Sequence, residues 1–203
     1  MFDSCVLGVD PGVANLGLAA VARDGKRPTL LWADTVTTGA DAPEAERLMA
    51  LVRAVRAAIA THVPVSVAVE RVAFNRNQVS ALTVARATGA VMVAAAEAGL
   101  TVDEYSPTEV KSAVTGAGNA DKRQVRDALE RVHGFRDLPR KPDAVDAAAV
   151  ALTHLMGARL RAAQRIGAAR LSPSSRGKWC TRVPRASCSA SEAWATTCRC
   201  RRR

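Results

Sequence analysis

The stretch Ser4-Cys5-Val6-Leu7-Gly8-Val9-Asp10-Pro11-Gly12 determines where the sheet of this protein begins and where its first charged group lies. Its apolar residues predict a β-strand over 4–10, and Pro11 with Gly12 turns the chain directly after Asp10. Asp10 is therefore expected at the rim of the sheet. A carboxylate at the end of a buried strand is costly to desolvate unless a cation compensates its charge. Taken alone, however, an Asp before Pro-Gly is more often a turn-capping residue than a catalytic one.

Three further carboxylates occupy comparable positions. Glu70 ends the short apolar run 65–70, which is typical of a strand buried on both faces, although Glu70 could instead pair with Arg71. Asp143 and Asp146 open an alanine-rich helix and, being three residues apart, lie on one face of it. One acid would suffice to cap that helix, whereas two acids on one face repel each other unless a cation lies between them.

Four carboxylates at such positions favour a divalent metal site over four separate structural roles. They are Asp10, Glu70, Asp143 and Asp146. Mg²⁺ is held in proteins by a few carboxylates together with water and phosphate oxygens. Two such ions, about 3.5 to 4 Å apart, can stabilise both the attacking and the leaving oxygen of a phosphodiester. The first hypothesis is therefore a nuclease.

The remaining sequence predicts an α/β protein. Strands are expected over 4–10, 16–22, 29–38, 65–70 and 100–105, and helices over 43–60, 78–98, 107–115, 120–132 and 143–163. The tight turn Asp24-Gly25 joins the second and third strands into an antiparallel meander. Three strands followed by alternating helices and strands indicate a mixed five-stranded sheet with helices on both faces. In such a sheet, the strands that end in Asp10 and Glu70 are expected to be neighbours.

The net charge of +10 is a weak argument for nucleic-acid binding because of where the charge lies. Nine of the 29 Lys and Arg residues follow residue 165, where Glu192 is the sole acid, so the rest of the chain is nearly neutral. We divide the chain into a globular domain, 1–165, and a basic tail, 166–203, that is expected to be disordered or non-native. The four tail cysteines lack the spacing of a zinc site, and Cys5 is expected to be a buried, inert thiol.

Neither a membrane segment nor a catalytic histidine is expected. No stretch is long and apolar enough for a membrane helix, and the first ten residues lack the layout of a signal peptide, which predicts a cytoplasmic protein. No catalytic role is assigned to His62, His133 or His154. His154 lies about 12 Å along its helix from Asp146, too far to share a metal ion with it, and is expected to be partly exposed.

Three segments resemble the RuvC family of Holliday junction resolvases, in the order and at the separations of that family. They are Gly8-Val9-Asp10-Pro11-Gly12 with Gly17, Val69-Glu70-Arg71-Val72 leading to 77–82, and 141–147 followed by Leu152-Thr153-His154. The similarity spans about residues 5 to 158. It implies a ribonuclease H-like fold and a metal-dependent endonuclease that resolves Holliday junctions by paired symmetric nicks during homologous recombination and DNA repair.

The resemblance also implies a site and its partners. The catalytic residues Asp10, Glu70, Asp143 and Asp146 would bind two Mg²⁺ or Mn²⁺ ions per active site. The residues that would contact DNA are Phe74, Arg76, Asn77, Lys111 and Lys122, with the two lysines near the scissile phosphate. The protein would act as a homodimer on four-way junction DNA, with the branch-migration proteins RuvA and RuvB as partners.

Two positions depart from the family pattern. Many members have an aromatic residue three positions after the catalytic glutamate, where this chain has Ala73, with Phe74 one place later. Base stacking at the junction centre therefore falls to Phe74 or is absent. Arg86 lies three residues before Gly89, whereas the family commonly places an arginine just before the glycine, so the contact of that arginine is not carried over.

Without the family resemblance, the residues are also compatible with two other functions. A catalytically idle, junction-binding structural module would use the same acids only to cap and to pair. An actin-like or sugar-kinase-type phosphotransferase would bind a nucleotide along Asp10–Gly17, because that loop also resembles the first phosphate loop of those enzymes. Metal-dependent nicking distinguishes a nuclease from the first alternative, and nucleotide binding identifies the second.

Overall fold

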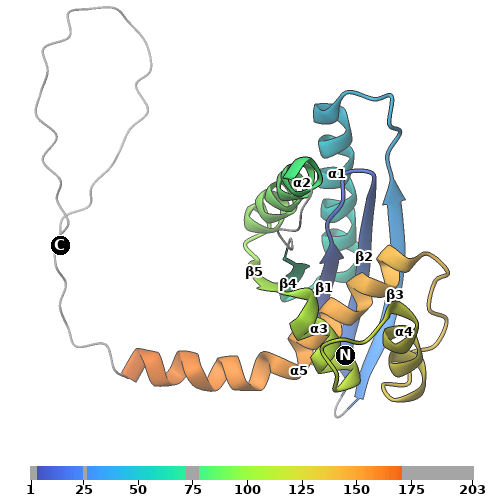
Figure 1. Ribbon diagram of the computed structural model, residues 1–203. Coiled ribbons are helices and arrows are strands. Elements are labelled where there is room, and N and C mark those ends of the chain that lie inside the picture. The colour runs from blue at the N-terminus through green and yellow to red at the C-terminus, as the bar shows by residue number, and fades with distance from the viewer. Residues whose placement is uncertain (1–3, 25–26, 72–77, 171–203) are drawn as a thin grey trace, which may run out of the picture.

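The computed structural model describes residues 4–24, 27–71 and 78–170, which contain one mixed five-stranded sheet (Figure 1). Its strands, in the order β3-β2-β1-β4-β5, are β1 (Ser4–Asp10), β2 (Asn15–Asp24), β3 (Arg27–Thr37), β4 (Ser66–Glu70) and β5 (Thr101–Tyr105). β1 to β3 form the predicted antiparallel meander, while β4 is parallel to both β1 and β5. The expected adjacency of the strands that end in Asp10 and Glu70 is confirmed.

Five helices accompany this sheet in the described part of the chain: α1 (Glu44–His62), α2 (Gln78–Glu97), α3 (Pro107–Thr115), α4 (Lys122–Arg131) and α5 (Pro142–Arg170). Local signals explain several of their ends. Ser106 caps α3 and Asp121 caps α4, each in a reciprocal capping box with the residue three positions on. Because Asp121 is a cap, α4 begins two residues later than the predicted segment 120–132. Gly116 ends α3 in the left-handed conformation, with φ of 80°.

α5 differs most from the predicted elements. It continues to Arg170, past the predicted end at 163 and across the predicted domain boundary after residue 165. The sequence there contains Ala, Arg and Gln, which are strong helix formers, and these outweigh Gly167 within the same stretch. Residues 171–203, the rest of the predicted tail, lie outside the described residues. Among the helices described, none is long and apolar enough to cross a lipid bilayer.

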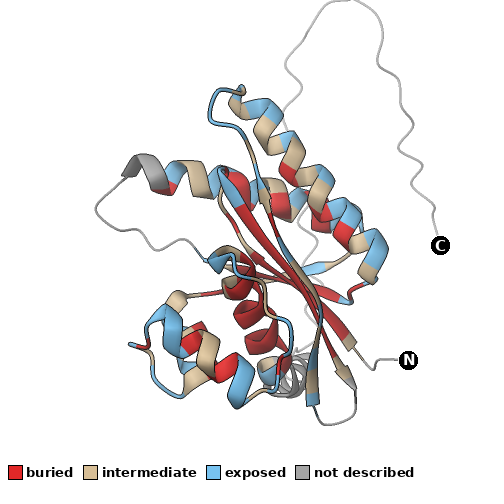
Figure 2. Cartoon of the chain, turned by 90° about the vertical axis from the view of Figure 1, so that its right-hand side faces the viewer, coloured by how far each residue is buried: buried red, intermediate tan, exposed pale blue. Residues whose placement is uncertain are grey.

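The two faces of the sheet are covered by different helices. α1 and α2 pack on one face, where leucines and valines such as Leu7, Val9 and Leu51 form the core. α5 packs on the other face, with α3 beside it, and this core is rich in alanine. Figure 2 shows the central strands and the first half of α5 as largely buried, whereas α1 is buried along one side only and the edge strands β3 and β5 are mostly exposed or intermediate. The even-numbered residues of β1 and β4, including Asp10 and Glu70, belong to the α5 side.

The backbone of α5 lies directly against β1 and β2 at two glycines. A Cβ atom on Gly8 would lie 2.1 Å from the carbonyl oxygen of Ala147, and one on Gly17 would lie 2.0 Å from that of Asp143. Glycine is the residue that permits so close an approach. The first turns of α5 are therefore held against the strand that ends in Asp10.

Candidate active site

Four carboxylates converge where β1, β4 and α5 meet. Asp10 and Glu70 end two neighbouring parallel strands, so both lie at the same edge of the sheet. By the alternation of side chains along each strand, both also lie on the α5 side. Asp143 and Asp146 approach the same place from the start of α5. The structure thus brings together the four acids that the sequence singled out.

The electrostatics show that the other carboxylates act on Asp10 and that Asp146 acts on Glu70. Burial raises the pKa of Asp10 to about 8, and the charges of the other three carboxylates add to the rise. The Asp10 carboxyl is therefore protonated at neutral pH and donates a hydrogen bond to the Glu70 carboxylate. Burial likewise raises the pKa of Glu70, and the charge of Asp146 adds to this, while the hydrogen bond from Asp10 opposes it.

Two lysines bring positive charge to the cluster. Lys122, the first residue of α4, places its Nζ 2.7 Å from Oδ2 of Asp146. This hydrogen bond is the largest cause of the raised pKa of Lys122. The charges of Lys122 and of Lys111 on α3 also lower the pKa of Glu70. Because the Lys122 side chain is 71% exposed, it is accessible to a phosphate as well as to Asp146.

The donor chemistry of the cluster suits a hard divalent cation. Within residues 4–24, 27–71 and 78–170, no three acidic, histidine or cysteine side chains are grouped closely enough to form a ready-made ion site. Positive charge is supplied instead by the proton between Asp10 and Glu70 and by Lys122 beside Asp146. Carboxylate oxygens are the ligands that Mg²⁺ and Mn²⁺ prefer, and such ions displace protons when they bind. The residues present therefore match the ion in charge and in ligand type.

A groove of about 430 Å³ opens beside the carboxylates. Its lining comprises the turn that follows β1, residues 11–15, together with Thr83 and Val84 of α2 and two of the acids, Asp10 and Asp143. Two of the four acids, Asp10 and Asp143, are thus accessible from this groove.

The expected DNA-contact residues fall into two groups. Phe74, Arg76 and Asn77 lie outside the described residues, as does Ala73, so their part in DNA binding stays a prediction. Lys111 and Lys122 lie in the described part, and their charges act on the carboxylates.

Two arginines whose partners the sequence did not decide form ion pairs outside the carboxylate cluster. Arg71 lies 3.7 Å from Glu109 of α3, which is its ion-pair partner in place of the neighbouring Glu70. Arg86 donates hydrogen bonds of 2.6 and 2.9 Å to the carboxylate of Glu44 and so ties α2 to α1. Arg86 thus has a structural contact.

The sequence-based expectation for His154 is wrong. This residue is buried, with 7% of its surface accessible, and it hydrogen-bonds with Ser66 of β4 at 2.9 Å and with Tyr105 of β5 at 3.0 Å. The helix period contained the signal, because His154 follows Ala147 by two turns and so shares the apolar face of α5. The prediction for Cys5, a buried free thiol, is confirmed.

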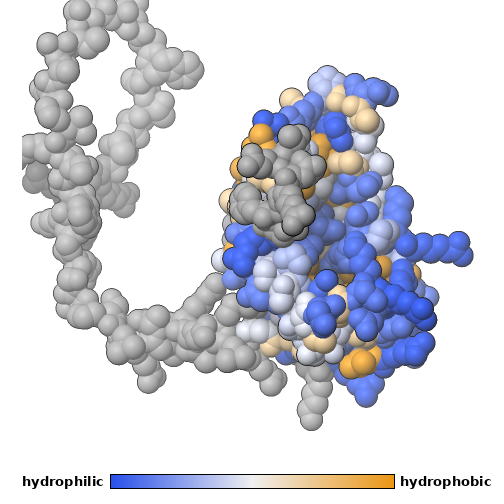
Figure 3. All heavy atoms as spheres, in the orientation of Figure 1, coloured by the Kyte–Doolittle hydropathy of each residue, from blue (hydrophilic) through white to orange (hydrophobic). Residues whose placement is uncertain are grey.

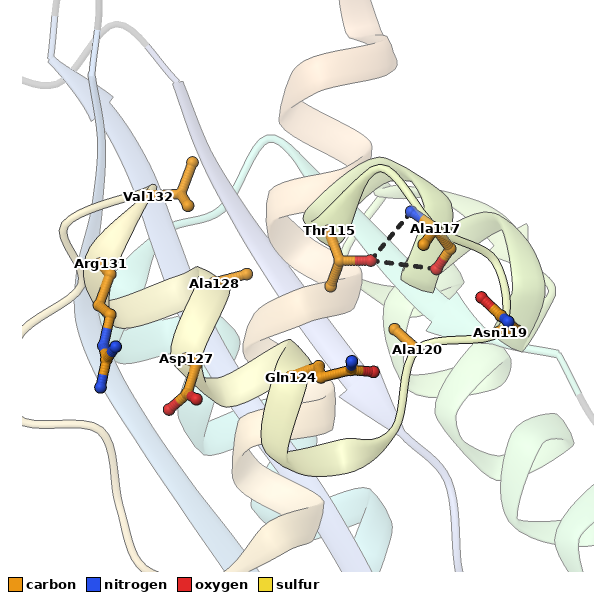
Figure 4. Close-up of a pocket in the computed structure, with 9 residues that line it drawn as sticks. All are labelled: Thr115, Ala117, Asn119, Ala120, Gln124, Asp127, Ala128, Arg131 and Val132. Carbon is orange, nitrogen blue, oxygen red and sulfur yellow. Dashed lines mark hydrogen bonds between the residues drawn. The ribbon is translucent and has the colours of Figure 1, made fainter.

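A second hollow, also of about 430 Å³, lies between the end of α3 and α4 (Figure 4). On one wall, the Thr115 hydroxyl hydrogen-bonds with the backbone of Ala117 and so holds the loop that follows α3. On the other wall lie Gln124, Asp127 and Arg131 of α4. The lining contains none of the four carboxylates, so this hollow is separate from the candidate active site.

One family matches most of the chain. Residues 6–154 match the family described as crossover junction endodeoxyribonuclease RuvC. The crossover junction endodeoxyribonuclease RuvC of Chloroflexus aggregans is 44% identical over 148 residues, which cover 73% of this chain and 90% of that relative.

Two solved structures of Thermus thermophilus RuvC share the fold. The first is 39% identical, with a TM-score of 0.71, over 77% of this chain and 96% of that chain. The second, in complex with a Holliday junction substrate, is 38% identical, with a TM-score of 0.73, over 78% of this chain and 96% of that chain. The ribonuclease H-like fold expected from the sequence is thereby confirmed.

Proposed function

We propose, from the premise that this chain belongs to the RuvC family of crossover junction endodeoxyribonucleases, that it resolves Holliday junctions by cutting DNA phosphodiesters at the carboxylate cluster. The observation that carries the proposal is the convergence of four acidic side chains, of which the other three raise the pKa of Asp10, beside a groove of about 430 Å³. The relative solved with a Holliday junction substrate supports the substrate class. The idle module and the phosphotransferase are not favoured, because the matching proteins are named endonucleases.

Two Mg²⁺ or Mn²⁺ ions would be held by the four acidic side chains, Asp10, Glu70, Asp143 and Asp146. When bound, such ions stabilise the attacking and the leaving oxygen of the phosphodiester. The proton between Asp10 and Glu70 has to leave before both residues can act as ligands, so binding of the ions is coupled to deprotonation. The contact of the α5 backbone with β1 and β2 then sets where the two acids of the helix meet the two acids of the sheet.

Lys122 is the side chain that would meet the negative charge developing on the phosphate. Its ammonium group already lies at the cluster, 2.7 Å from Asp146, and most of its side chain is exposed. A preorganised positive charge of this kind stabilises the transition state more than the bound substrate. Lys111 would add charge from α3 on the same side, as its effect on Glu70 indicates.

A homodimer is proposed through the exposed face of α2. Leu82 and Val93 are 55% and 57% exposed, and the position of a Cβ atom on Gly89, between them, has nothing within 4 Å. These three residues share one face of the helix, and residues of high hydropathy are visible near α2 in Figure 3. Two copies packed here would present two active sites with two-fold symmetry, as paired nicks on a four-way junction require. RuvA and RuvB are the proposed partners on the same junction.

The basic tail, 166–203, is proposed to add non-specific DNA affinity to the nuclease domain, 1–165. Truncation after Arg170 keeps all of α5 and removes most of the basic residues of the tail. Metal-dependent junction cleavage should persist, while affinity for DNA of unrelated sequence should fall and depend less on salt. A truncated protein that no longer folds would contradict this division.

Three residues that follow β4, Phe74, Arg76 and Asn77, are proposed to face the junction. The proposed location of the protein is the cytoplasm.

The test of the function is incubation with a synthetic four-way junction, with Mg²⁺ or Mn²⁺ and with a chelator. The wild type should produce paired nicks with either metal and none with the chelator. Asp10→Asn, Glu70→Gln and Asp146→Asn should each abolish cleavage and leave junction binding intact or stronger, because losing a carboxylate removes transition-state stabilisation and relieves repulsion of phosphates. Glu97→Gln, whose side chain pairs with Arg56 at the other end of α2, is the matched control. Substantial cleavage by Asp10→Asn would contradict the two-metal proposal.

A further inference from the structure

A buried polar bridge joins α5 to β4 and β5. The ring of His154 lies 2.9 Å from the Ser66 hydroxyl through Nε2 and 3.0 Å from the Tyr105 hydroxyl through Nδ1. Each of these three residues has 7% of its surface accessible. The Tyr105 ring also meets the imidazole edge-on, with 5.9 Å between the ring centroids. The bridge is therefore a packed as well as a hydrogen-bonded contact.

Both nitrogens of the His154 ring have hydroxyl partners. A hydroxyl can donate or accept a hydrogen bond, so Ser66 and Tyr105 satisfy either neutral tautomer of the imidazole. Loss of one hydroxyl removes one hydrogen bond of the buried ring, which is unfavourable, although the Asp103 carboxylate also lies near the ring, with its Oδ2 3.9 Å from Nδ1. A satisfied polar network in a protein interior favours one arrangement of the elements that contribute to it.

The bridge and the carboxylates lie at opposite ends of one helix–strand contact. His154 follows Asp146 by eight residues, which is about 12 Å along α5. Ser66 precedes Glu70 by four residues, which is about 13 Å along β4. The two lengths match, so α5 runs antiparallel to β4 with acids at one end and the bridge at the other. The contact between Ser66 and His154 therefore limits how far α5 can slide along the strand that carries Glu70.

Tyr105 extends the bridge to two more elements of the site. Its backbone pairs with Glu70 in the register of β4 and β5. The next residue, Ser106, caps α3, which carries Lys111. On the β1 and β2 side, α5 is held by glycine contacts with its backbone, whereas on the β4 and β5 side the His154 side chain makes the connection.

We propose that His154, through Ser66 and Tyr105, is a positioning residue that sets the separation between Glu70 on β4 and the two carboxylates on α5. The inference rests on the proposed metal-binding function of those carboxylates. A displacement of α5 by about 1 Å would hold its acids in the wrong geometry for an ion. Polar groups that orient metal ligands change metal affinity or activity about 10- to 100-fold when they are removed.

Tyr105→Phe and Ser66→Ala each remove one hydroxyl from the bridge with little change in shape. Thr153→Val is the matched control, because the buried Thr153 hydroxyl donates to the Ala149 carbonyl at 2.8 Å within α5 and so stabilises the helix without joining it to the sheet. Four quantities are measured: Mn²⁺ affinity of the DNA-free protein by electron paramagnetic resonance, single-turnover cleavage of a four-way junction, junction affinity in Ca²⁺, and Tm.

Tyr105→Phe and Ser66→Ala should bind Mn²⁺ about tenfold more weakly and cleave about tenfold more slowly, with junction affinity unchanged. His154→Gln, which keeps one hydrogen-bonding group near Nε2, should bind Mn²⁺ more tightly than the Tyr105→Phe/Ser66→Ala double variant. Thr153→Val should match the wild type in Mn²⁺ affinity and rate even if its Tm falls.

Variants of Tyr105 and Ser66 with a lower Tm but wild-type Mn²⁺ affinity would overturn the inference, because the bridge would then only stabilise the fold. A wild type that binds Mn²⁺ but leaves junctions uncut would overturn the proposed function alone, and the Mn²⁺ titrations would still decide the role of His154. A wild type that binds no Mn²⁺ would overturn both.

Discussion

The two faces of the sheet hold their helices in different ways. On one face, the backbone of α5 touches β1 and β2 at Gly8 and Gly17. On the other face, fully buried side chains such as Leu7, Val9 and Leu51 separate α1 and α2 from the strands. A layer of apolar side chains tolerates repacking, whereas two backbones in direct contact leave no room to adjust. α5 is therefore held in one position, and α1 and α2 rest on an adjustable layer.

The more tightly held face of the sheet is also the face that carries the acidic side chains. Asp143 and Asp146 lie on the helix in backbone contact, beside Asp10, and a functional site needs its groups within about 0.5 Å of the productive geometry. The adjustable face instead carries the exposed apolar side of α2, which suits assembly. Substitutions on the two faces should therefore separate the rate of cleavage from the stability of the fold.

Gly8→Ala should have the largest effect, because it disrupts the backbone contact itself. The new Cβ would lie 2.1 Å from the Ala147 carbonyl oxygen and 2.8 Å from the Ala151 Cβ, so α5 must move away from β1. A displacement of about 1 Å at the carboxylates should slow single-turnover junction cleavage ~10²-fold or more, and the Tm should fall as well. Gly39→Ala is the control, since nothing lies within 4 Å of its Cβ position. Wild-type cleavage by Gly8→Ala would show that this close approach does not position the acids.

Lys122→Ala tests the α5 face without disturbing its packing. If this lysine meets the transition-state phosphate, cleavage should slow by ~10² with only a small change in junction affinity, because a preorganised charge acts on the rate. Single-turnover cleavage at saturating enzyme measures the rate, and binding in Ca²⁺ measures the affinity. Arg123→Ala, an exposed cation one residue further along α4, should leave the rate unchanged. A wild-type rate for Lys122→Ala would remove this residue from the site.

Leu51→Ala tests the adjustable face. Leu51 is fully buried between α1 and the sheet, so its truncation should lower the free energy of unfolding by about 2–5 kcal/mol. The rate of cleavage by folded protein should stay close to wild type, because no catalytic group lies on that layer. Urea denaturation and single-turnover cleavage at low temperature give the two quantities. A loss of rate as large as that of Gly8→Ala would show that the two faces are not separable.

The smallest expected effect is a pH dependence of stability in metal-free protein. The pKa of Asp10 is raised from an ordinary 3.8 to about 8, so between these values the folded state binds one more proton at this residue than the unfolded state. The free energy of unfolding should therefore fall as pH rises from about 4 to about 8. Asp10→Asn should lose this dependence and gain a few degrees in Tm over the wild type at pH 9, measured with a chelator. A constant difference in Tm between the two proteins across this range would contradict the raised pKa.

Much of the fold and the site could be predicted because the signals are local. The apolar runs placed all five strands within two residues of their observed bounds. Pro11 and Gly12 placed Asp10 at a strand end, and the three-residue spacing of Asp143 and Asp146 placed both on one side of a helix start. What could not be predicted is non-local. The helix period put His154 on the apolar face, but only the packing of α5 shows that two hydroxyls from β4 and β5 lie against it.

The sequence by itself determined the order and nature of the elements and the strand and helix ends at which the four carboxylates lie, because hydrophobic period, turn residues and caps act over a few positions along the chain. Tertiary structure alone decided how closely those elements approach. Gly17 is simply a small residue in the sequence, and its importance appears only once the Asp143 carbonyl oxygen is found 2.0 Å from where a Cβ would lie. The same holds for the proton between Asp10 and Glu70 and for Lys122 beside Asp146. Charge interactions depend on distance through space and on burial, and neither is set until the helix rests on the sheet.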